Sequence, residues 1–320
     1  MSILYFFADL FGYVLNFLYS LIGNYGVAII IFSILAKLIM LPLTIKQQKT
    51  MKKTAKIQEE MKQIQFKYKN DPEKMNQEVM ALYKREDMSP FSGCLSSIVQ
   101  IILVLAVFIL VSSPLTYMVK LDKEEINKLN EVVSQEQPTE NRYKEIAIIR
   151  YIRNLGPQTS VSEEGKEEVK DVDERESENQ EFNVYDYIEK VDLNMDFFGI
   201  DLSAVPTDNL SNWKALIIPV LYVITSFISI RLTTATQIKK QKESNLITDG
   251  SEEAKKEEEI NPMLDANKSM SWFMPIMSIS IAIIAPLGLA LYWLMNNILM
   301  IVERLVLNKF MNKEEETNNV

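Results

Sequence analysis

The sequence predicts an all-α membrane protein with five transmembrane helices, a cytoplasmic helical hairpin and an N-terminal interfacial helix. Of its 320 residues 48% are hydrophobic, and they gather in stretches almost without charge, separated by strongly charged segments. A helix needs about 20 mostly apolar residues to cross a bilayer core, whereas an open sheet would leave unpaired edge amides in lipid. The five apolar stretches are Val27–Leu43, Leu95–Val111, Ala215–Leu232, Trp272–Leu287 and Leu289–Val306.

These stretches divide the chain into spans and connecting segments. We expect an interfacial helix at 1–24, spans at 25–44, 91–115 and 213–232, a fourth and fifth span as a hairpin at 271–307, a cytoplasmic coiled-coil hairpin at 45–90, an extracytoplasmic acidic loop at 116–212, a cytoplasmic loop at 233–270 and a cytoplasmic tail at 308–320. Residues 3–22 are apolar enough to span, but Asp9, Asn16 and the many aromatic residues near them suit the membrane surface better.

The charge of the loops predicts the orientation. Segment 44–92 holds 11 basic and 7 acidic residues, whereas segment 116–212 holds 11 basic and 23 acidic residues. Basic loops stay in the cytoplasm, so the first segment is expected inside and the second outside. All five spans agree with an outer N-terminus and a cytoplasmic C-terminus.

The hairpin at 45–90 is predicted from two apolar seams at helical spacing. They are Ile57, Met61, Ile64 and Tyr68 on the first arm, and Met75, Val79 and Leu82 on the second. Between the arms, Asp71 is placed to cap a helix and Pro72 suits its first position. The pattern indicates a mobile surface that touches a partner or the membrane; a plain charged spacer is the alternative.

The long outer loop contains one predicted helix and one segment that cannot form a core. Ile146, Ile149 and Ile152 recur at helical spacing within 141–155. Residues 160–181 are acidic and of low complexity, a composition that buries too little apolar surface to fold.

The composition excludes most enzyme classes. The sequence has no histidine, its single cysteine is Cys94, and it contains no glycine-rich phosphate-binding loop. Imidazole-based catalytic triads, histidine metal sites and disulfides within the chain are therefore excluded. We expect a protein that is not an enzyme and that has no cofactor, no metal and no direct contact with nucleic acid.

Lys37 is the most informative residue of the spans. It lies six residues before Leu43, the inner end of the first apolar stretch, or roughly 9 Å deep at the helical rise. A charge at this depth costs about 3 kcal/mol on insertion scales and needs a partner, water or an escape route. Snorkelling of the ammonium to the headgroups would be a purely structural explanation.

Polar residues from other spans lie at a similar depth and favour a water-filled groove around Lys37. Singly, serine and threonine can serve as packing contacts between helices. Because the outer halves, such as Leu103–Val111, are apolar, the groove is expected to be closed to the outside. The polar residues are Ser33 and Thr44 in the first span, Ser92, Ser96 and Gln100 in the second, Thr225, Ser226 and Ser229 in the third, and Ser278 and Ser280 in the fourth.

Short motifs in a fixed order closely resemble YidC-type membrane protein insertases of the five-span, Gram-positive-like form. These are Gly23–Gly26, Leu41–Gln48, Ser89–Cys94 with Ile98–Gln100, and Pro286–Trp293 with Asn296–Asn297. The resemblance covers most of the chain except parts of the outer and inner loops. It implies a cofactor-free insertase of the bacterial plasma membrane that moves nascent helices from the cytoplasm into lipid, alone or beside the Sec translocon.

The resemblance also assigns roles to residues and names partners. The family's groove cation falls on Lys37, its groove glutamine on Gln100, and its aromatic pair on Tyr292 and Trp293. The hairpin corresponds to the family's proposed substrate-receiving site, and nascent membrane proteins, the ribosome, the Sec translocon and lipids are the implied partners. The family cation is usually arginine, and lysine keeps the charge but loses the planar fork.

Two other functions stay open from the sequence. A secondary transporter or channel could use Lys37 as a ligand, although the sequence shows no inverted repeat. An assembly or sensor protein could use the acidic outer loop as its working part.

Overall fold

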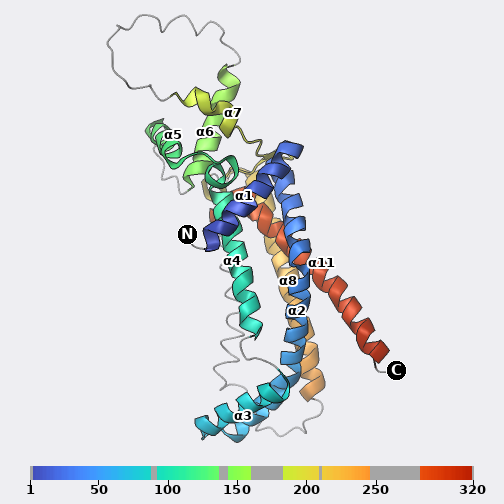
Figure 1. The fold of residues 1–320 in the computed structure, drawn as a ribbon. Helices are drawn as coiled ribbons and strands as arrows, with labels where there is room; N and C mark the ends of the chain where they lie inside the picture. Colours follow the sequence, from blue (N-terminus) through green and yellow to red (C-terminus); the bar gives the residue numbers. More distant parts are fainter. Residues whose placement is uncertain are drawn as a thin grey trace, which may run out of the picture. The chain divides into compact units, whose positions relative to one another are not determined.

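The computed structural model describes residues 3–87, 92–136, 143–159, 183–208, 211–245 and 282–318. These residues are almost all helical, and the chain divides into two compact units. The first unit comprises Met1–Ser33, Leu105–Tyr222 and Ile279–Met295. The second comprises Ile34–Val104, Val223–Ser278 and Asn296–Val320. The long helices α2, α4, α8 and α11 contribute residues to both units (Figure 1).

Four helices of the described chain are long and apolar enough to cross a membrane. They are Ile3–Ile22, Tyr25–Thr50, Trp213–Leu232 and Leu287–Leu307. Helix α4 (Ser92–Ser112) adds a shorter apolar stretch at Ile101–Ser112, and the predicted span Trp272–Leu287 lies largely outside the described residues. The predicted class, an all-α membrane protein, is confirmed. The number of spans and the interfacial position of α1 (Ile3–Ile22) stay predictions.

The membrane helices continue beyond the predicted spans. Helix α2 runs unbroken from Tyr25 to Lys67, through Pro42, so the first span and the first arm of the hairpin form one helix. Helix α8 (Trp213–Asn245) extends into the predicted cytoplasmic loop, and α11 (Leu287–Asn318) extends into the predicted tail. Lysine, glutamate and glutamine favour helix, and no glycine or proline interrupts these extensions.

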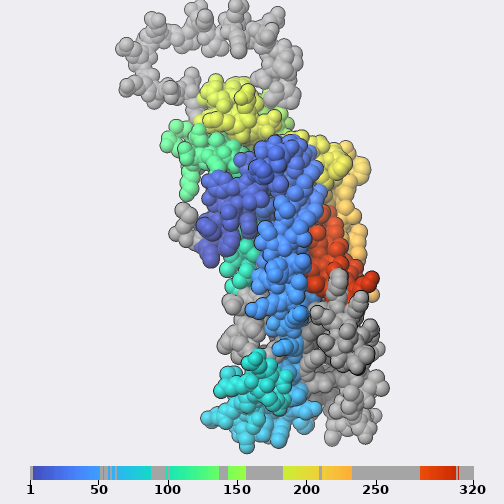
Figure 2. Space-filling view, turned by 45° about the vertical axis from the view of Figure 1, so that its right-hand side comes forward, coloured from blue at the N-terminus to red at the C-terminus, as the bar shows by residue number. Residues whose placement is uncertain are grey.

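In the second unit the hairpin closes as the sequence predicts. Helix α3 (Pro72–Arg85) begins with a proline, and the Asp71 side chain accepts a hydrogen bond of 3.1 Å from the backbone N–H of Lys74. Ile57 on α2 and Leu82 on α3 are buried. The space-filling view shows α3 against the end of α2 (Figure 2). The two arms therefore share a narrow apolar seam.

In the first unit α1 packs on the turn that ends α4. This turn is the π-helix η1 (Leu115–Val119). Gly12 lies so close to it that a Cβ atom would come within 1.9 Å of the backbone oxygen of Tyr117. Lys120, which follows η1, pairs with Asp9 of α1. The position of Gly12 is thus fixed by close backbone packing.

The described part of the predicted outer loop folds into a small helical layer in the first unit. Helices α5 (Lys123–Glu136), α6 (Lys144–Thr159) and α7 (Ile188–Val191) lie together with the 3₁₀-helix η3 (Val184–Tyr187) (Figure 1). The helix predicted at 141–155 is confirmed as α6, whereas α5 was not predicted. The acidic segment predicted to remain unfolded, 160–181, lies outside the described residues. The buried apolar side chains include Ile126, Leu129 and Val133 on α5 and Ile148, Ile149 and Ile152 on α6.

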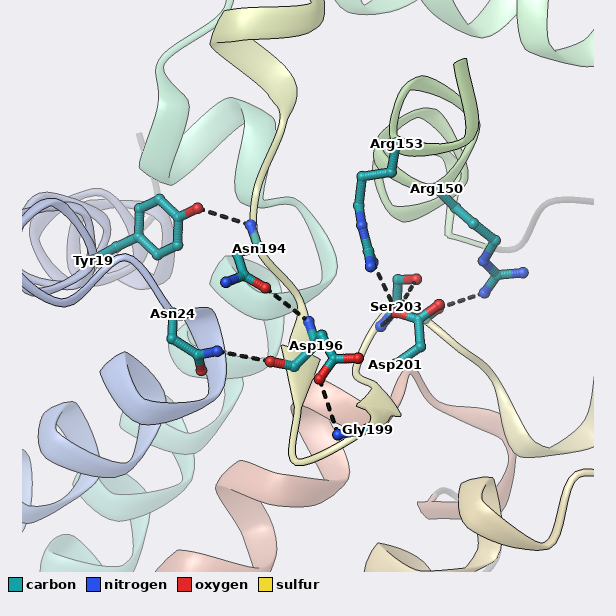
Figure 3. Close-up of polar contacts among 9 residues, drawn as sticks. All are labelled: Tyr19, Asn24, Arg150, Arg153, Asn194, Asp196, Gly199, Asp201 and Ser203. Carbon is teal, nitrogen blue, oxygen red and sulfur yellow. Dashed lines mark hydrogen bonds and ion pairs between the residues drawn. The ribbon is translucent and has the colours of Figure 1, made fainter. Parts of the chain in front are cut away.

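A short β-hairpin ties the start of α2 to the rest of the first unit. Strand β1 (Asp196–Phe197) pairs antiparallel with β2 (Ile200–Asp201). The Asn24 side chain donates to the backbone oxygen of Asp196 at 2.7 Å, and the backbone N–H of Asn194 donates to the hydroxyl of Tyr19 at 2.8 Å (Figure 3). These contacts fix the junction between α1 and α2.

The same hairpin is held from the other side by two arginines of α6. Arg153 donates to Asp201 at 3.0 Å, and Arg150 donates to the backbone oxygen of Ser203 (Figure 3). Asp201 also accepts from the backbone N–H and the hydroxyl of Ser203. The short helix η4 (Pro206–Asp208) follows. Charge-assisted bonds of this kind are stronger than neutral ones, so α6 anchors the hairpin.

One hydrophobic cluster joins the helix ends of the first unit. The backbone N–H groups of Leu287 and Gly288 donate to the oxygens of Ala204 and Leu202 at 2.9 Å, which fixes the start of α11. Apolar side chains from four helices fill this end of the bundle. They include Ala28, Ile29 and Phe32 of α2, Val107, Leu110 and Val111 of α4, Ala215 and Ile218 of α8, and Leu289 and Leu291 of α11.

Glu145 is a buried carboxylate at the start of α6. Its two oxygens accept hydrogen bonds from the backbone N–H of Thr116 at 2.9 Å and from the Thr116 hydroxyl at 2.6 Å. Burial raises the pKa of the Glu145 carboxyl above its ordinary value, and the hydrogen bonds from Thr116 and Ser113 offset only part of the increase. The carboxylate links α6 to η1.

We expect Gly12→Ala to destabilise the first unit. In an open helix position alanine is favoured over glycine by about 1 kcal/mol. Here the new Cβ would meet the Tyr117 backbone, and such overpacking costs about 1–3 kcal/mol. The measurement is thermal unfolding of the purified protein in detergent, with Ser20→Ala on the exposed side of α1 as the matched control. Equal stability of the two variants would contradict the packing of α1 on η1.

We expect Glu145→Gln to remove a pH-dependent loss of stability. Because the pKa is raised on folding, stability falls as the pH rises from the ordinary value of 4.5 through the folded pKa. The amide can accept from the N–H of Thr116 and donate to its hydroxyl. The stability of the variant relative to the parent should therefore rise across this window and then level off. Unfolding in detergent from about pH 4 to about pH 8 measures it.

The exposed Glu131→Gln on α5 is the control for this experiment. A difference between Glu145→Gln and the parent that does not change with pH would contradict the assignment.

Candidate functional site

The second unit contains an ion pair between two apolar helices, α2 and α11. The ammonium of Lys37 on α2 lies 2.6 Å from Oε2 of Glu303 on α11. The two side chains are only 16% and 6% exposed. A charged group at this depth needs a partner, and α11 provides one. The interaction is stronger than it would be in water because the low dielectric of the surroundings screens it less.

Thr44 completes the surroundings of the carboxylate. Its hydroxyl donates to Oε1 of Glu303, whereas the ammonium of Lys37 lies 2.6 Å from Oε2, and the hydroxyl also lies 2.9 Å from the backbone oxygen of Leu41. Thr44 is seven residues after Lys37 on α2, and seven residues make about two helical turns. One face of α2 therefore supplies both groups that hold the carboxylate.

Two further polar contacts connect α8 and α11 in the same unit. The side-chain amide of Asn297 donates to the hydroxyl of Ser226 at 2.7 Å. A guanidinium nitrogen of Arg304 donates to the backbone oxygen of Ser229 at 3.4 Å. Ser226 and Ser229 are both buried. Helix α11 thus directs Asn297 and Arg304 toward α8 and Glu303 toward α2.

The predicted groove residues divide between the two units. Ser33 belongs to the first unit, where it is buried and donates to the backbone oxygen of Ile29 at 2.7 Å. Its hydroxyl therefore satisfies the helix itself. Thr225 belongs to the second unit with Lys37. The side chains of Ser96 and Gln100, and all of Ser278 and Ser280, lie outside what the structure describes.

Tyr292 and Trp293 are part of the first unit. Tyr292 belongs to its hydrophobic cluster, and Trp293 packs against that cluster. The ring of Trp293 lies 6.0 Å from the ring of Tyr222 on α8, at a tilt of 36°, which is a favourable aromatic arrangement. Both residues have a packing role there, and their place in a substrate groove stays a prediction.

The predicted substrate-receiving residues surround the turn of the hairpin. The sulfur of Met61 accepts a hydrogen bond of 3.6 Å from the hydroxyl of Tyr83. Lys67 and Lys74 lie over the ring of Tyr68, at 5.3 and 5.4 Å from its centre. Ile64 is half-buried. Asp71 and Pro72 start α3, as described above, and their part in receiving substrates stays a prediction.

Sequence reasoning missed Glu303. The residue lies within the last apolar stretch, three residues before its end, and directly precedes Arg304. An acid inside a span is as costly as a base, so its presence together with Lys37 was a signal for a pair. Among the described residues no cluster could hold a metal ion.

A sequence model of the family described as 60Kd inner membrane protein matches residues 17–315 of the chain. Several relatives carry the name "Membrane protein insertase YidC". The chain is 42% identical to the protein from Fusobacterium nucleatum over 97 residues, which are 30% of this chain and 47% of that protein. It is 39% identical to the Caldanaerobacter subterraneus protein over the same shares. For the protein from Geobacter sp. the identity is 48% over 89 residues, or 28% of this chain and 17% of that protein. The match thus spans at most about half the length of these relatives.

We expect the contact between Ser226 and Asn297 to couple the two residues energetically. Hydrogen bonds between membrane helices contribute about 0.6 kcal/mol on average and at most about 1.7 kcal/mol. A double-mutant cycle of Ser226→Ala and Asn297→Ala, measured by unfolding in detergent, should give a coupling in this range. Purely additive effects would contradict the hydrogen bond.

Proposed function

The chain belongs to the 60Kd inner membrane protein family, and from that premise we propose that it is a membrane protein insertase rather than an enzyme. It is a multi-pass protein of the bacterial plasma membrane. The proposed activity is to move nascent helices from the cytoplasm into the bilayer. The name of the relatives supports this activity.

The observation that carries the proposal is the Lys37–Glu303 pair. A purely structural helix contact would not need two charges, because apolar packing can replace a buried ion pair at no cost in stability. In the proposed insertase, a positive group at this depth attracts the acidic part of a client into the membrane and offsets part of its desolvation cost. The Lys37 side chain, which is 16% exposed, fits that use.

The proposed mechanism lowers a barrier and involves no covalent step. A hydrated groove that reaches partway across the membrane shortens the hydrocarbon path of the client, and local thinning of the bilayer shortens it further. In this proposal the groove contains Lys37, Ser226 and Ser229, with Thr225 nearby; Ser33, Ser96, Gln100, Tyr292 and Trp293 are further candidates.

The groove is proposed to be closed toward the outside. In support of this, the ends of four helices in the first unit are packed around one apolar cluster, and backbone hydrogen bonds fasten the start of α11 to the segment after β2. Interiors packed in this way leave few voids larger than a water molecule. A client helix would therefore leave sideways into lipid.

The hairpin is the proposed receiving surface for clients. Besides the capped turn, it exposes Phe66 on α2 and Met80 on α3, and adaptable methionine-rich surfaces can bind varied apolar segments. Residues Met61, Ile64 and Tyr68 would contribute. We propose the ribosome and the Sec translocon as partners, with the N-terminus outside and the C-terminus in the cytoplasm.

A secondary transporter or channel that uses Lys37 as a ligand is the competing proposal. The packed cluster in the first unit argues against a continuous pore. Ion or solute flux through liposomes that contain the purified protein would favour the transporter.

We expect Lys37→Ala to impair insertion severalfold and Lys37→Arg to be tolerated. Alanine removes the cation and leaves Glu303 unpaired, whereas arginine keeps the charge. The measurement is insertion of a single-span client, synthesised in vitro, into liposomes with the purified variant, scored by protection from protease. Equal insertion by the alanine variant would remove Lys37 from the mechanism.

A further inference from the structure

The charge of Lys37 is already neutralised by the chain itself. One oxygen of Glu303 contacts the ammonium, and Thr44 donates to the other. An acidic residue of a client that approaches Lys37 must therefore compete with Glu303. This competition follows from the contacts and depends on the proposed use of Lys37 as an attractor of clients.

We propose that Glu303 is an internal counter-ion that occupies Lys37 between clients and sets which clients are inserted. Replacing one carboxylate by another at Lys37 keeps the cation paired, and the released Glu303 carboxylate keeps the hydrogen bond from Thr44, which offsets part of the cost of leaving the pair. A cation without a partner at this depth would be costly, since breaking a buried pair leaves an uncompensated charge. Glu303 thus makes capture possible without an exposed charge and makes release possible afterwards.

The geometry suits such an exchange. Lysine contacts a carboxylate as a point charge, through one oxygen here. Thr44 can keep its hydrogen bond to the second oxygen while the ammonium turns to a new partner. The carboxylate then keeps one donor when it leaves the pair. Specificity between clients is a difference of affinities. A client acid binds Lys37 only if its affinity for the ammonium competes with that of Glu303.

The substitution that tests this proposal is Glu303→Gln. Glutamine keeps the size of the side chain and an oxygen that can accept from Thr44, but it removes the competing charge. Two single-span clients are compared in liposomes, identical except that the translocated segment carries two aspartates or two asparagines. The ratio of acidic to neutral client inserted should rise about fivefold over the parent. An unchanged ratio would overturn the proposal.

A neutral double variant separates this result from the proposed function. Lys37→Gln with Glu303→Gln has no charge at the site, so the acidic client should lose its advantage if Lys37 attracts it. If this double variant inserts both clients as well as the parent does, the role of Lys37 fails. If the double variant loses insertion of the acidic client but Glu303→Gln leaves the ratio unchanged, only the counter-ion role fails.

Stability is measured for every variant, because Glu303→Gln leaves Lys37 unpaired. Glu303→Asp is the second test, since it keeps the charge but shortens the side chain and weakens the contact. It should change the client ratio in the same direction by a smaller factor. A loss of insertion that is equal for both clients and follows the loss of stability would show a purely structural pair and overturn the proposal.

Discussion

The free-energy cost of a charge inside the membrane is the constraint on which the site depends. Lys37 is placed in an apolar helix, where an isolated ammonium costs several kcal/mol, of order 3 on insertion scales. The structure meets this cost with an acid from a distant part of the chain, at 2.6 Å, and with a hydroxyl that holds the acid. Helix α11 must therefore stand beside α2 in the second unit, and its contacts to α8 through Asn297 and Arg304 follow from the same placement.

In the described part of the first unit the helix ends are joined by hydrogen bonds and ion pairs outside the five apolar stretches, and not by a charge pair within them. These hydrogen bonds are made by the segments that connect the long helices. The segment from Asn194 to Ala204 receives hydrogen bonds from the start of α2, from α6 and from the start of α11. Below these ties the side chains are apolar and buried. Polar contacts at the helix ends thus leave the interior of this unit to apolar side chains.

Features encoded by neighbouring residues could be predicted from the sequence, whereas those that join distant residues could not. Asp71 and Pro72 predict the start of α3, and the spacing of the isoleucines in α6 predicts a helix. The spacing of Ile126, Leu129 and Val133 also indicated α5, and it was overlooked in a polar loop. The strands β1 and β2 have two residues each, too few for any period. For the site, Lys37 was predicted, but its partner lies on another helix and no local pattern connects them.

The choice of lysine at position 37 has a structural consequence. An arginine presents several donors in a fixed fork and would engage both oxygens of one carboxylate. The lysine engages one oxygen of Glu303 and leaves the other to Thr44. The carboxylate of Glu303 thus has two donors, Lys37 and Thr44. When the contact to Lys37 is broken, the hydrogen bond from Thr44 remains. Because buried carboxylates without a donor are costly, this arrangement would lower the barrier to the proposed exchange of Glu303 for an acidic residue of a client.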